Sequence, residues 1–213
     1  PGLEHPDMPA LDVLAVIAGQ GRSSRLYREL RDKRRLVNSI HAFSFTPAGP
    51  GLFGVSAVLD PGKRTETEEA ILQVMERIKQ DSVTEAELAK AKRGIITGHL
   101  NSRKTMSGMA SELGGNYFAT RSRDFTTRYL QAVQRVSRDD IRRVANQYLQ
   151  DSNLTTVSLN PAGTVKDTKT AVPAGAELPI QKFDLPGGLR LLVREDPRLP
   201  FVTIRAVCRG GVL

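Results

Sequence analysis

The fold of this chain is set by the stretch ALDVLAVIAGQGRSSRLYRELR, which spans residues 10–31. Its first half carries apolar residues at helical spacing and ends at Gly19. Pro9 lies just before it, in the first turn of a helix, where the missing backbone N–H costs nothing. We therefore expect a helix over residues 9–19.

The next segments predict a second helix and a β-hairpin. Small residues at 21–24 predict a turn, after which a helix is expected to run to about Arg34. Residues 38–46 then alternate in side-chain character, and residues 52–59 continue the extended pattern after a turn that is rich in proline and glycine. This arrangement is typical of an antiparallel hairpin with a longer loop.

Three later helix starts carry the signature of a capping box, in which a hydroxyl and an acid three residues later satisfy each other's backbone N–H groups. The pairs are Thr65 with Glu68, Thr84 with Glu87, and Ser137 with Asp140. Residues 106–117 and 125–136 also have a helical pattern, with breaks expected at Gly114-Gly115 and at 121–123. A short strand is predicted at 154–159, after this helical block.

The composition changes after residue 160. Residues 161–179 are rich in Ala, Gly, Thr and Pro and lack periodicity, which predicts a linker. Beyond the linker the pattern is wholly β, with short strands expected at 182–185, 189–195 and 201–209. Three strands without a covering helix leave open edges, so we expect them to pair with the main sheet or to give a strand-paired homo-oligomer.

Composition and charge disfavour several function classes. The 213 residues carry a net charge of +8, with the densest basic stretch between Arg22 and Arg35, but acidic residues interrupt that stretch and no nucleic-acid-binding motif accompanies it. Aromatic residues are only 5% and Trp is absent, which leaves few platforms for stacking bases. We therefore expect no nucleic-acid partner, and a basic nucleic-acid-binding domain stays open only as a third option. No apolar run of about 18 residues occurs, so no membrane span is expected.

The sequence contains no visible catalytic centre. A zinc hydrolase needs three protein ligands, commonly with paired histidines at short spacing. The histidines are His5, His41 and His99, and neither H-E-x-x-H nor its inverse H-x-x-E-H occurs. Cys208 is the single cysteine, so no internal disulfide can form. It lies on an alternating strand pattern, which is typical of a small buried side chain. The residues alone therefore predict an α+β domain without an active site, and they leave the compartment open between periplasm and cytoplasm.

Residues 10–31 resemble the second domain of the pitrilysin/insulinase family of zinc peptidases, in which a helix, a small-residue turn and a Ser-Arg-Leu-Tyr segment precede a strand hairpin. The downstream order is similar as well: a hairpin, a helix, and then residues 83–88, Val-Thr-Glu-Ala-Glu-Leu, opening a long helix. Residues 183–193 and 202–211 resemble the strands that open the next repeat. The resemblance thus covers nearly the whole chain.

This resemblance implies an α+β fold, a mostly antiparallel sheet covered by helices, like the domains of mitochondrial processing peptidase. Family members are zinc endopeptidases whose two halves enclose a chamber for unfolded peptides, and an H-x-x-E-H motif in the first domain holds the metal. Residues 1–160 would then be the second, non-metal domain, lacking its first strand, followed by a linker at 161–179 and the opening strands of the next domain at 180–213. The chain alone is expected to be inactive and to hold no cofactor, with zinc in the parent protein.

The implied work of such a domain is to support the metal domain and to line the chamber, with the remaining domains and an unfolded peptide as partners. The family's other half commonly supplies an Arg and a Tyr, seven residues apart, that hold the substrate. Arg31 matches that Arg, but Asn38 takes the place of the Tyr. We name Arg31 and, for its charge, Arg25 as candidate substrate-binding residues, and we assign no catalytic residue and no metal ligand. A solvated helix charge stays open for Arg31, and a metal-free core or partner subunit of the same fold stays open for the parent.

Overall fold

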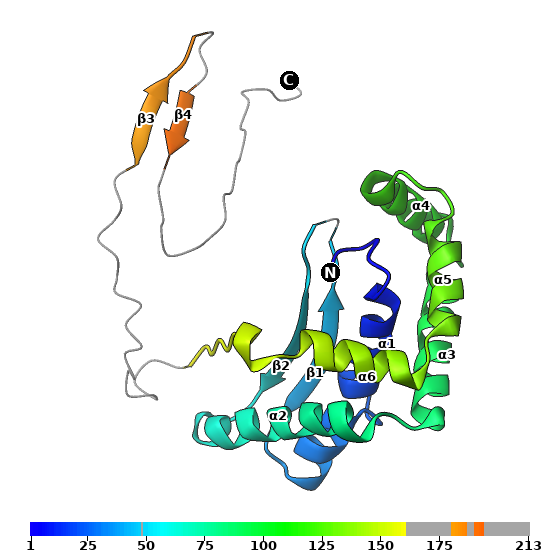
Figure 1. The fold of residues 1–213 in the computed structure, drawn as a ribbon, viewed down its shortest axis with the longest axis vertical. Helices are drawn as coiled ribbons and strands as arrows, with labels where there is room; N and C mark the ends of the chain where they lie inside the picture. Colours follow the sequence, from blue (N-terminus) through cyan, green and yellow to red (C-terminus); the bar gives the residue numbers. More distant parts are fainter. Residues whose placement is uncertain (48, 161–179, 187–189, 194–213) are drawn as a thin grey trace. The chain divides into compact units, whose positions relative to one another are not determined.

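The computed structural model describes residues 1–47, 49–160, 180–186 and 190–193. Its contacts divide the chain into two units, Pro1–Asn160 and Pro161–Leu213. The first unit, shown in blue to yellow in Figure 1, contains the following elements in chain order: α1 (Met8–Gly19), η1 (Tyr27–Lys33), β1 (Ser39–Phe45), β2 (Leu52–Val58), η2 (Pro61–Lys63), α2 (Arg64–Asp81), α3 (Glu85–Ser102), α4 (Met106–Thr120), α5 (Phe125–Arg135), α6 (Arg138–Tyr148) and η3 (Asp151–Asn153). Both described sheets are antiparallel pairs, so the predicted α+β class is confirmed.

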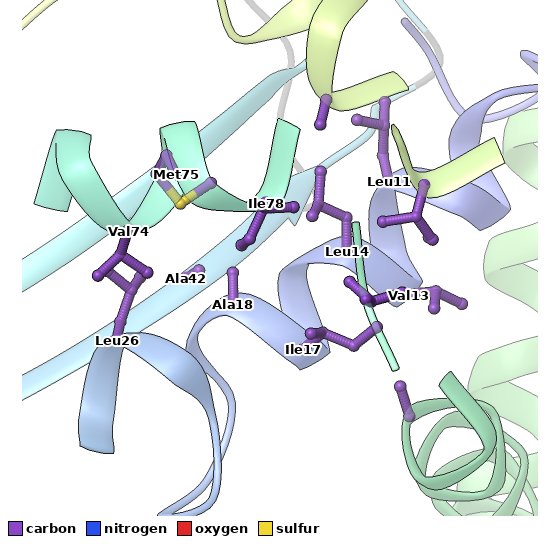
Figure 2. Packing of buried hydrophobic residues seen from close by; sticks show 14 of the residues in the cluster. Leu11, Val13, Leu14, Ile17, Ala18, Leu26, Ala42, Val74, Met75 and Ile78 are labelled. Atoms are coloured by element: carbon purple, nitrogen blue, oxygen red, sulfur yellow. The ribbon is translucent and has the colours of Figure 1, made fainter. Parts of the chain in front are cut away.

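Helix α1 is the centre of the first unit. Ten of its twelve residues are buried, and it contacts β1, α3, α5 and α6. A helix that is apolar on nearly all sides is stable in water only when other elements surround it. Figure 2 shows how side chains from α1, β1 and α2 meet in one cluster, with Leu14 and Ile78 fully buried.

The hairpin matches the sequence prediction closely. Ser39 lies opposite Val58 and Phe45 lies opposite Leu52, so the register is continuous over seven pairs. Ile40 and Ala42 of β1 are buried while their neighbours face out, as the alternation predicted. Helix α1 packs on this pair of strands.

Two glycines let the chain leave α1 and turn. A Cβ atom built on Gly19 would lie 2.1 Å from the backbone nitrogen of Ala42, so only glycine permits this approach of helix to strand. Gly21 has a φ of 79°, which is left-handed backbone that glycine adopts without strain. The Gly19-Gln20-Gly21 motif is therefore explained by packing and turning.

Of the three predicted capping boxes, two form and one does not. Thr84 with Glu87 and Ser137 with Asp140 make both reciprocal hydrogen bonds. The prediction at Thr65 is wrong, because α2 begins at Arg64 after the 3-10 turn η2. Glu68 is instead drawn into an i,i+4 ion pair with Arg64, whose Nε lies 2.8 Å from Glu68 Oε1.

Two further expectations are corrected. Helix α4 runs through Gly114-Gly115 without the predicted break, held by the Thr105 cap and by side-chain contacts from Glu112 and Asn116. Residues 154–160 form no strand with the described part of the chain, and Leu154, Val157 and Leu159 are exposed. A strand needs a neighbour for its backbone groups, and among the described residues of the first unit the only strand pairing is that of β1 with β2.

The second unit is described at one hairpin, β3 (Gln181–Asp184) with β4 (Arg190–Val193). These are two of the three strands predicted beyond the linker, and they pair with each other. The third, at 201–209, lies outside the described residues, as does the predicted linker. Within the described ranges, no helix has the length and apolar character that crossing a membrane requires.

Candidate functional site

A basic hollow of about 380 Å³ lies in the first unit, and η1 forms one side of it. This helix is wider than predicted: η1 is a π-helix, and Arg34 N donates to the carbonyl oxygen of Glu29, five residues earlier. Such single π turns occur often at functional sites. The other sides come from the end of α2, the loop after it and the starts of α3 and α6.

The charges around this basic hollow are mostly positive. Its basic residues are Arg25, Arg28, Lys33, Arg77 and Arg138, and its acidic residues are Glu29, Asp81 and Glu87. The hollow therefore carries a net charge of +2, from five cations and three anions. A concave surface of one dominant sign concentrates its field on molecules of opposite charge.

Arg25, one of the two predicted substrate-binding residues, lines the basic hollow and is held in a clamp. Its Nε and Nη2 donate to the two carboxylate oxygens of Glu87, both at 2.8 Å, and Nη2 also donates to the Ser82 carbonyl oxygen at 2.9 Å. Bidentate pairs of this kind fix geometry as well as adding energy. The clamp joins the turn before η1 to the start of α3, so the structure gives Arg25 a structural contact, and substrate binding by it stays a prediction.

Glu87 serves the clamp and the helix cap together. The Thr84 N–H donates to its carboxylate at 2.8 Å, and its own N–H donates to the Thr84 hydroxyl at 3.2 Å. The hydrogen bonds from Arg25, with smaller contributions from Thr84, outweigh the cost of burial and lower the pKa of Glu87 to about 2. The carboxylate is therefore charged at every physiological pH and is committed to Arg25.

Two cations of the basic hollow other than the predicted substrate-binding residues make no ion pair with a described residue. Arg28 on η1 and Arg77 on α2 are exposed and make no ion pair within the described ranges. Lys33 is paired with Glu29 at 3.2 Å, and Arg138 lies 3.8 Å from Glu85. Arg28 and Arg77 are therefore the side chains of the basic hollow best placed to bind an anionic group.

Arg31, the other predicted substrate-binding residue, does not line the basic hollow. Its guanidinium carbon lies 5.0 Å above the centre of the Tyr27 ring, and Nη1 donates to the Tyr27 hydroxyl. Arg31 thus has an aromatic partner four residues before it on η1, whereas Asn38 uses its backbone N–H to continue the hairpin. Arg25 and Arg31 therefore do not line the same hollow, and the role of Arg31 stays a prediction.

The three histidines lie on separate elements. His5 precedes α1 and accepts a hydrogen bond from Asp7 N, His41 is on β1, and His99 is on α3 beside the Tyr129 ring. Among the described residues, no group of three or more His, Cys, Asp or Glu side chains is arranged to hold a metal ion.

Two carboxylates near α1 tie distant helices together. Asp7 accepts from Arg143 at 2.6 Å and from Tyr148 at 2.7 Å, and the Arg143 hydrogen bond is the main reason that its pKa lies below the ordinary value despite burial. Asp12 accepts from the Tyr129 hydroxyl at 2.8 Å, and burial raises the pKa of its carboxyl. Both contacts bind α1 to the C-terminal helices, and we assign them a structural role.

Sequence reasoning could not have found Arg77 or Arg138, because each lies far along the chain from η1 and reaches the basic hollow only through the packing of α2 and α6. Arg28, in contrast, belongs to the basic stretch between Arg22 and Arg35 that the sequence shows. The signal that separates it from Arg25 is tertiary: Arg25 meets Glu87 and Arg28 meets no acid among the described residues.

Comparison with known proteins identifies relatives of this chain. Residues 1–95 match the family described as Peptidase M16 inactive domain. The chain is 30% identical over 162 residues to zinc protease PqqE of Helicobacter pylori, covering 76% of this chain and 36% of that protein. It is 27% identical over 153 residues to mitochondrial-processing peptidase subunit beta of Saccharomyces cerevisiae, covering 71% of this chain and 33% of that protein.

The same fold occurs in the crystal structure of a protease from Helicobacter pylori, with a TM-score of 0.66 and 29% identity over 71% of this chain and 37% of that one. The chain therefore belongs to the pitrilysin/insulinase (M16) family of peptidases. In particular, it carries the inactive domain of that family. It spans about a third of the length of the curated relatives it matches.

Proposed function

We propose that this chain is the non-catalytic part of a zinc-dependent endopeptidase, that it supports the metal domain, and that it lines the chamber in which unfolded peptides are hydrolysed. The match of residues 1–95 to the inactive domain is the observation that carries this proposal. Relatives that are named zinc proteases are about three times as long as the matched region, which leaves room for a metal domain elsewhere in the parent. Zinc would be held there and not by the described residues of this chain.

The basic hollow supports a more specific part of the proposal: it favours peptides with acidic side chains. Arg28 and Arg77 are exposed and have no acidic partner among the described residues, so a bound carboxylate would not have to displace one. Each exposed pair with a peptide carboxylate contributes roughly 0.2–1 kcal/mol. Arg31 would add to the same field from outside the hollow, whereas Arg25 would act by holding the hollow in shape.

The test uses the full-length parent peptidase with the double substitution Arg28→Gln and Arg77→Gln. We expect kcat/KM for an acidic peptide to fall about 2-fold to 30-fold, while kcat/KM for a neutral peptide of the same length stays within about 2-fold. The loss should shrink as salt is added, because screening weakens exposed charge pairs. Arg25 is left unchanged, since losing the clamp to Glu87 would disturb the fold itself.

Arg93→Gln is the matched control, because Arg93 is an exposed arginine of α3 that does not line the basic hollow. Equal effects of the double variant on acidic and neutral peptides would contradict the role of the hollow. If the purified parent itself shows no chelator-sensitive cleavage, the parent is a metal-free partner subunit of the same fold and the proposed peptidase function is wrong.

A further inference from the structure

Helix α4 is built with its polar side inward. No residue of α4 is buried. The side chains that make contact with neighbouring helices are polar: Glu112 accepts from Arg103 on one side and from Thr126 on the other, and Asn116 donates to Thr126 at 2.7 Å. The large apolar residues of the helix are exposed.

Four of these apolar residues make one surface, which we call the α4 apolar face: Met106, Met109, Leu113 and Tyr117. They follow one another at intervals of three or four residues, so they lie along one side of the helix. Their exposed fractions run from 40% for Met109 to 86% for Met106. Scattered exposed apolar residues are ordinary, but a contiguous set of four large ones along one side of a helix marks an interaction site.

We propose that the α4 apolar face docks against the remaining part of the parent peptidase. This inference rests on the proposed function only in that it takes the parent to have further domains. The length of the relatives favours that occupant, because about two thirds of each matched relative lies outside the region that this chain covers. Figure 1 shows α4 at the end of the first unit where α3 ends and α5 begins.

The charges around α4 specify the chemistry of the partner. Glu112 is the one charged residue of the helix, and it points inward to Arg103. Basic residues flank the helix at both ends, namely Lys104, Arg121 and Arg123, and none of the three makes an ion pair with another described residue. The complementary surface is therefore apolar at its centre and acidic at its rim.

The same charges disfavour a second copy of this chain as the occupant. Two α4 helices packed across a twofold axis would bring the basic ends of one helix near those of the other, and like charges placed together cost free energy. An acidic lipid surface would satisfy the basic rim, and the experiment below separates it from a protein partner.

Methionine oxidation provides the test, because the chain has four methionines that divide cleanly between core and α4. Met8 and Met75 are buried, and Met106 and Met109 lie on the α4 apolar face. The full-length parent and the 213-residue chain are treated with dilute hydrogen peroxide, and the rate of sulfoxide formation at each residue is followed by mass spectrometry. The rates at Met8 and Met75 report within the same sample whether the fold is intact.

In the 213-residue chain we expect Met106 to oxidise at least about 10-fold faster than Met75, because oxidation follows exposure. In the full-length parent we expect Met106 to slow to within about 3-fold of Met75. An unchanged fast rate at Met106 in the parent, with Met75 slow, would overturn the proposal. So would protection that appears in the chain alone at high concentration, which indicates a second copy, or only on adding phosphatidylserine vesicles, which indicates a membrane.

A substitution gives an independent readout. Leu113→Lys in the parent should restore fast oxidation at Met106, because a buried lysine without a partner would force the two surfaces apart. Ser111→Lys, at an exposed position of the same helix outside the α4 apolar face, should leave Met106 protected. These measurements need neither zinc nor cleavage, so their failure and the failure of the proposed peptidase function are separate results.

Discussion

Helices α1 and α4 both carry several large apolar residues, but they differ in how far those residues are buried. Ten of the twelve residues of α1 are buried among β1, α3, α5 and α6, whereas none of the fifteen residues of α4 is buried. Helix α4 is held instead by polar contacts through Glu112 and Asn116. The difference separates two uses of apolar surface: α1 stabilises the domain itself, and α4 is available for association with something outside it.

The largest loss of stability is predicted for a substitution in the core around α1. Leu14→Ala should lower the free energy of unfolding by about 2–5 kcal/mol, because a fully buried leucine leaves a cavity when it is truncated. Leu113→Ala is the matched control on α4, where the same change should cost no more than about 0.5 kcal/mol, since Leu113 is 42% exposed. Urea unfolding of the 213-residue chain measures both. Equal losses from the two substitutions would show that α4 belongs to the core.

An intermediate effect is expected at the clamp between Arg25 and Glu87. Glu87→Gln removes a charge that receives two hydrogen bonds from Arg25, and we expect the free energy of unfolding to fall by about 1–3 kcal/mol. Glu85→Gln, two residues away, changes an exposed carboxylate 3.8 Å from Arg138 and should cost about 0.5 kcal/mol or less. A Glu85 variant that is as unstable as the Glu87 variant would contradict the assignment.

The clamp also predicts a pH dependence. The pKa of Glu87 is about 2 in the folded chain against an ordinary value of 4.5, so the unfolded chain binds the proton more tightly. Its contribution to stability is therefore complete above pH 4.5 and is lost as the pH falls toward 2. Urea unfolding at pH 7, 4 and 2.5 should show a smaller acid loss for Glu87→Gln than for the unaltered chain, and identical acid losses would be evidence against the clamp.

The smallest change in stability is predicted for a substitution that weakens only the contacts of α4. Burial opposes the charge on Glu112, yet hydrogen bonds from Thr126 and Arg103 outweigh it and hold its pKa below the ordinary value. Glu112→Gln should change the free energy of global unfolding by less than about 1 kcal/mol but should speed amide hydrogen exchange in α4 several-fold. Glu69→Gln on α2, an exposed carboxylate, should leave exchange in α4 unchanged. Uniform acceleration across all helices would contradict the view of α4 as a separate element.

Much of the first unit could be predicted from sequence because its signals are local. Spacing of apolar residues predicted α1, alternation predicted the hairpin of β1 and β2, and the Thr84 and Ser137 boxes predicted the starts of α3 and α6. These patterns depend on neighbours within four residues or on one side of a strand, and such neighbours are visible in the sequence.

The errors arise where a local signal competes with another local contact or depends on a partner elsewhere in the chain. The Thr65 box yields to the turn η2 and to the pairing of Glu68 with Arg64. The extended pattern of 154–159 gives no strand because none of the described strands pairs with it. The basic hollow also depends on tertiary packing, since α2 and α6 supply Arg77 and Arg138.

Helix α4 is the most instructive case. The sequence predicted a helix over 106–117, and its apolar residues recur at intervals of three and four residues, as those of a core helix also do. What distinguishes it is the position of its polar residues: Glu112 and Asn116 both face the neighbouring helices. Only the structure shows which side of a helix is turned inward, so the docking surface could not be predicted from periodicity.

The most direct test of the whole account is the zinc content of the purified 213-residue chain beside that of the full-length parent, with cleavage of an unstructured peptide measured with and without a chelator. We predict no stoichiometric zinc and no chelator-sensitive cleavage for the chain, and both for the parent. Stoichiometric zinc and chelator-sensitive cleavage in the chain alone would mean that its own residues form the metal site. The assignment of this chain as the inactive, supporting part of the peptidase would then be wrong.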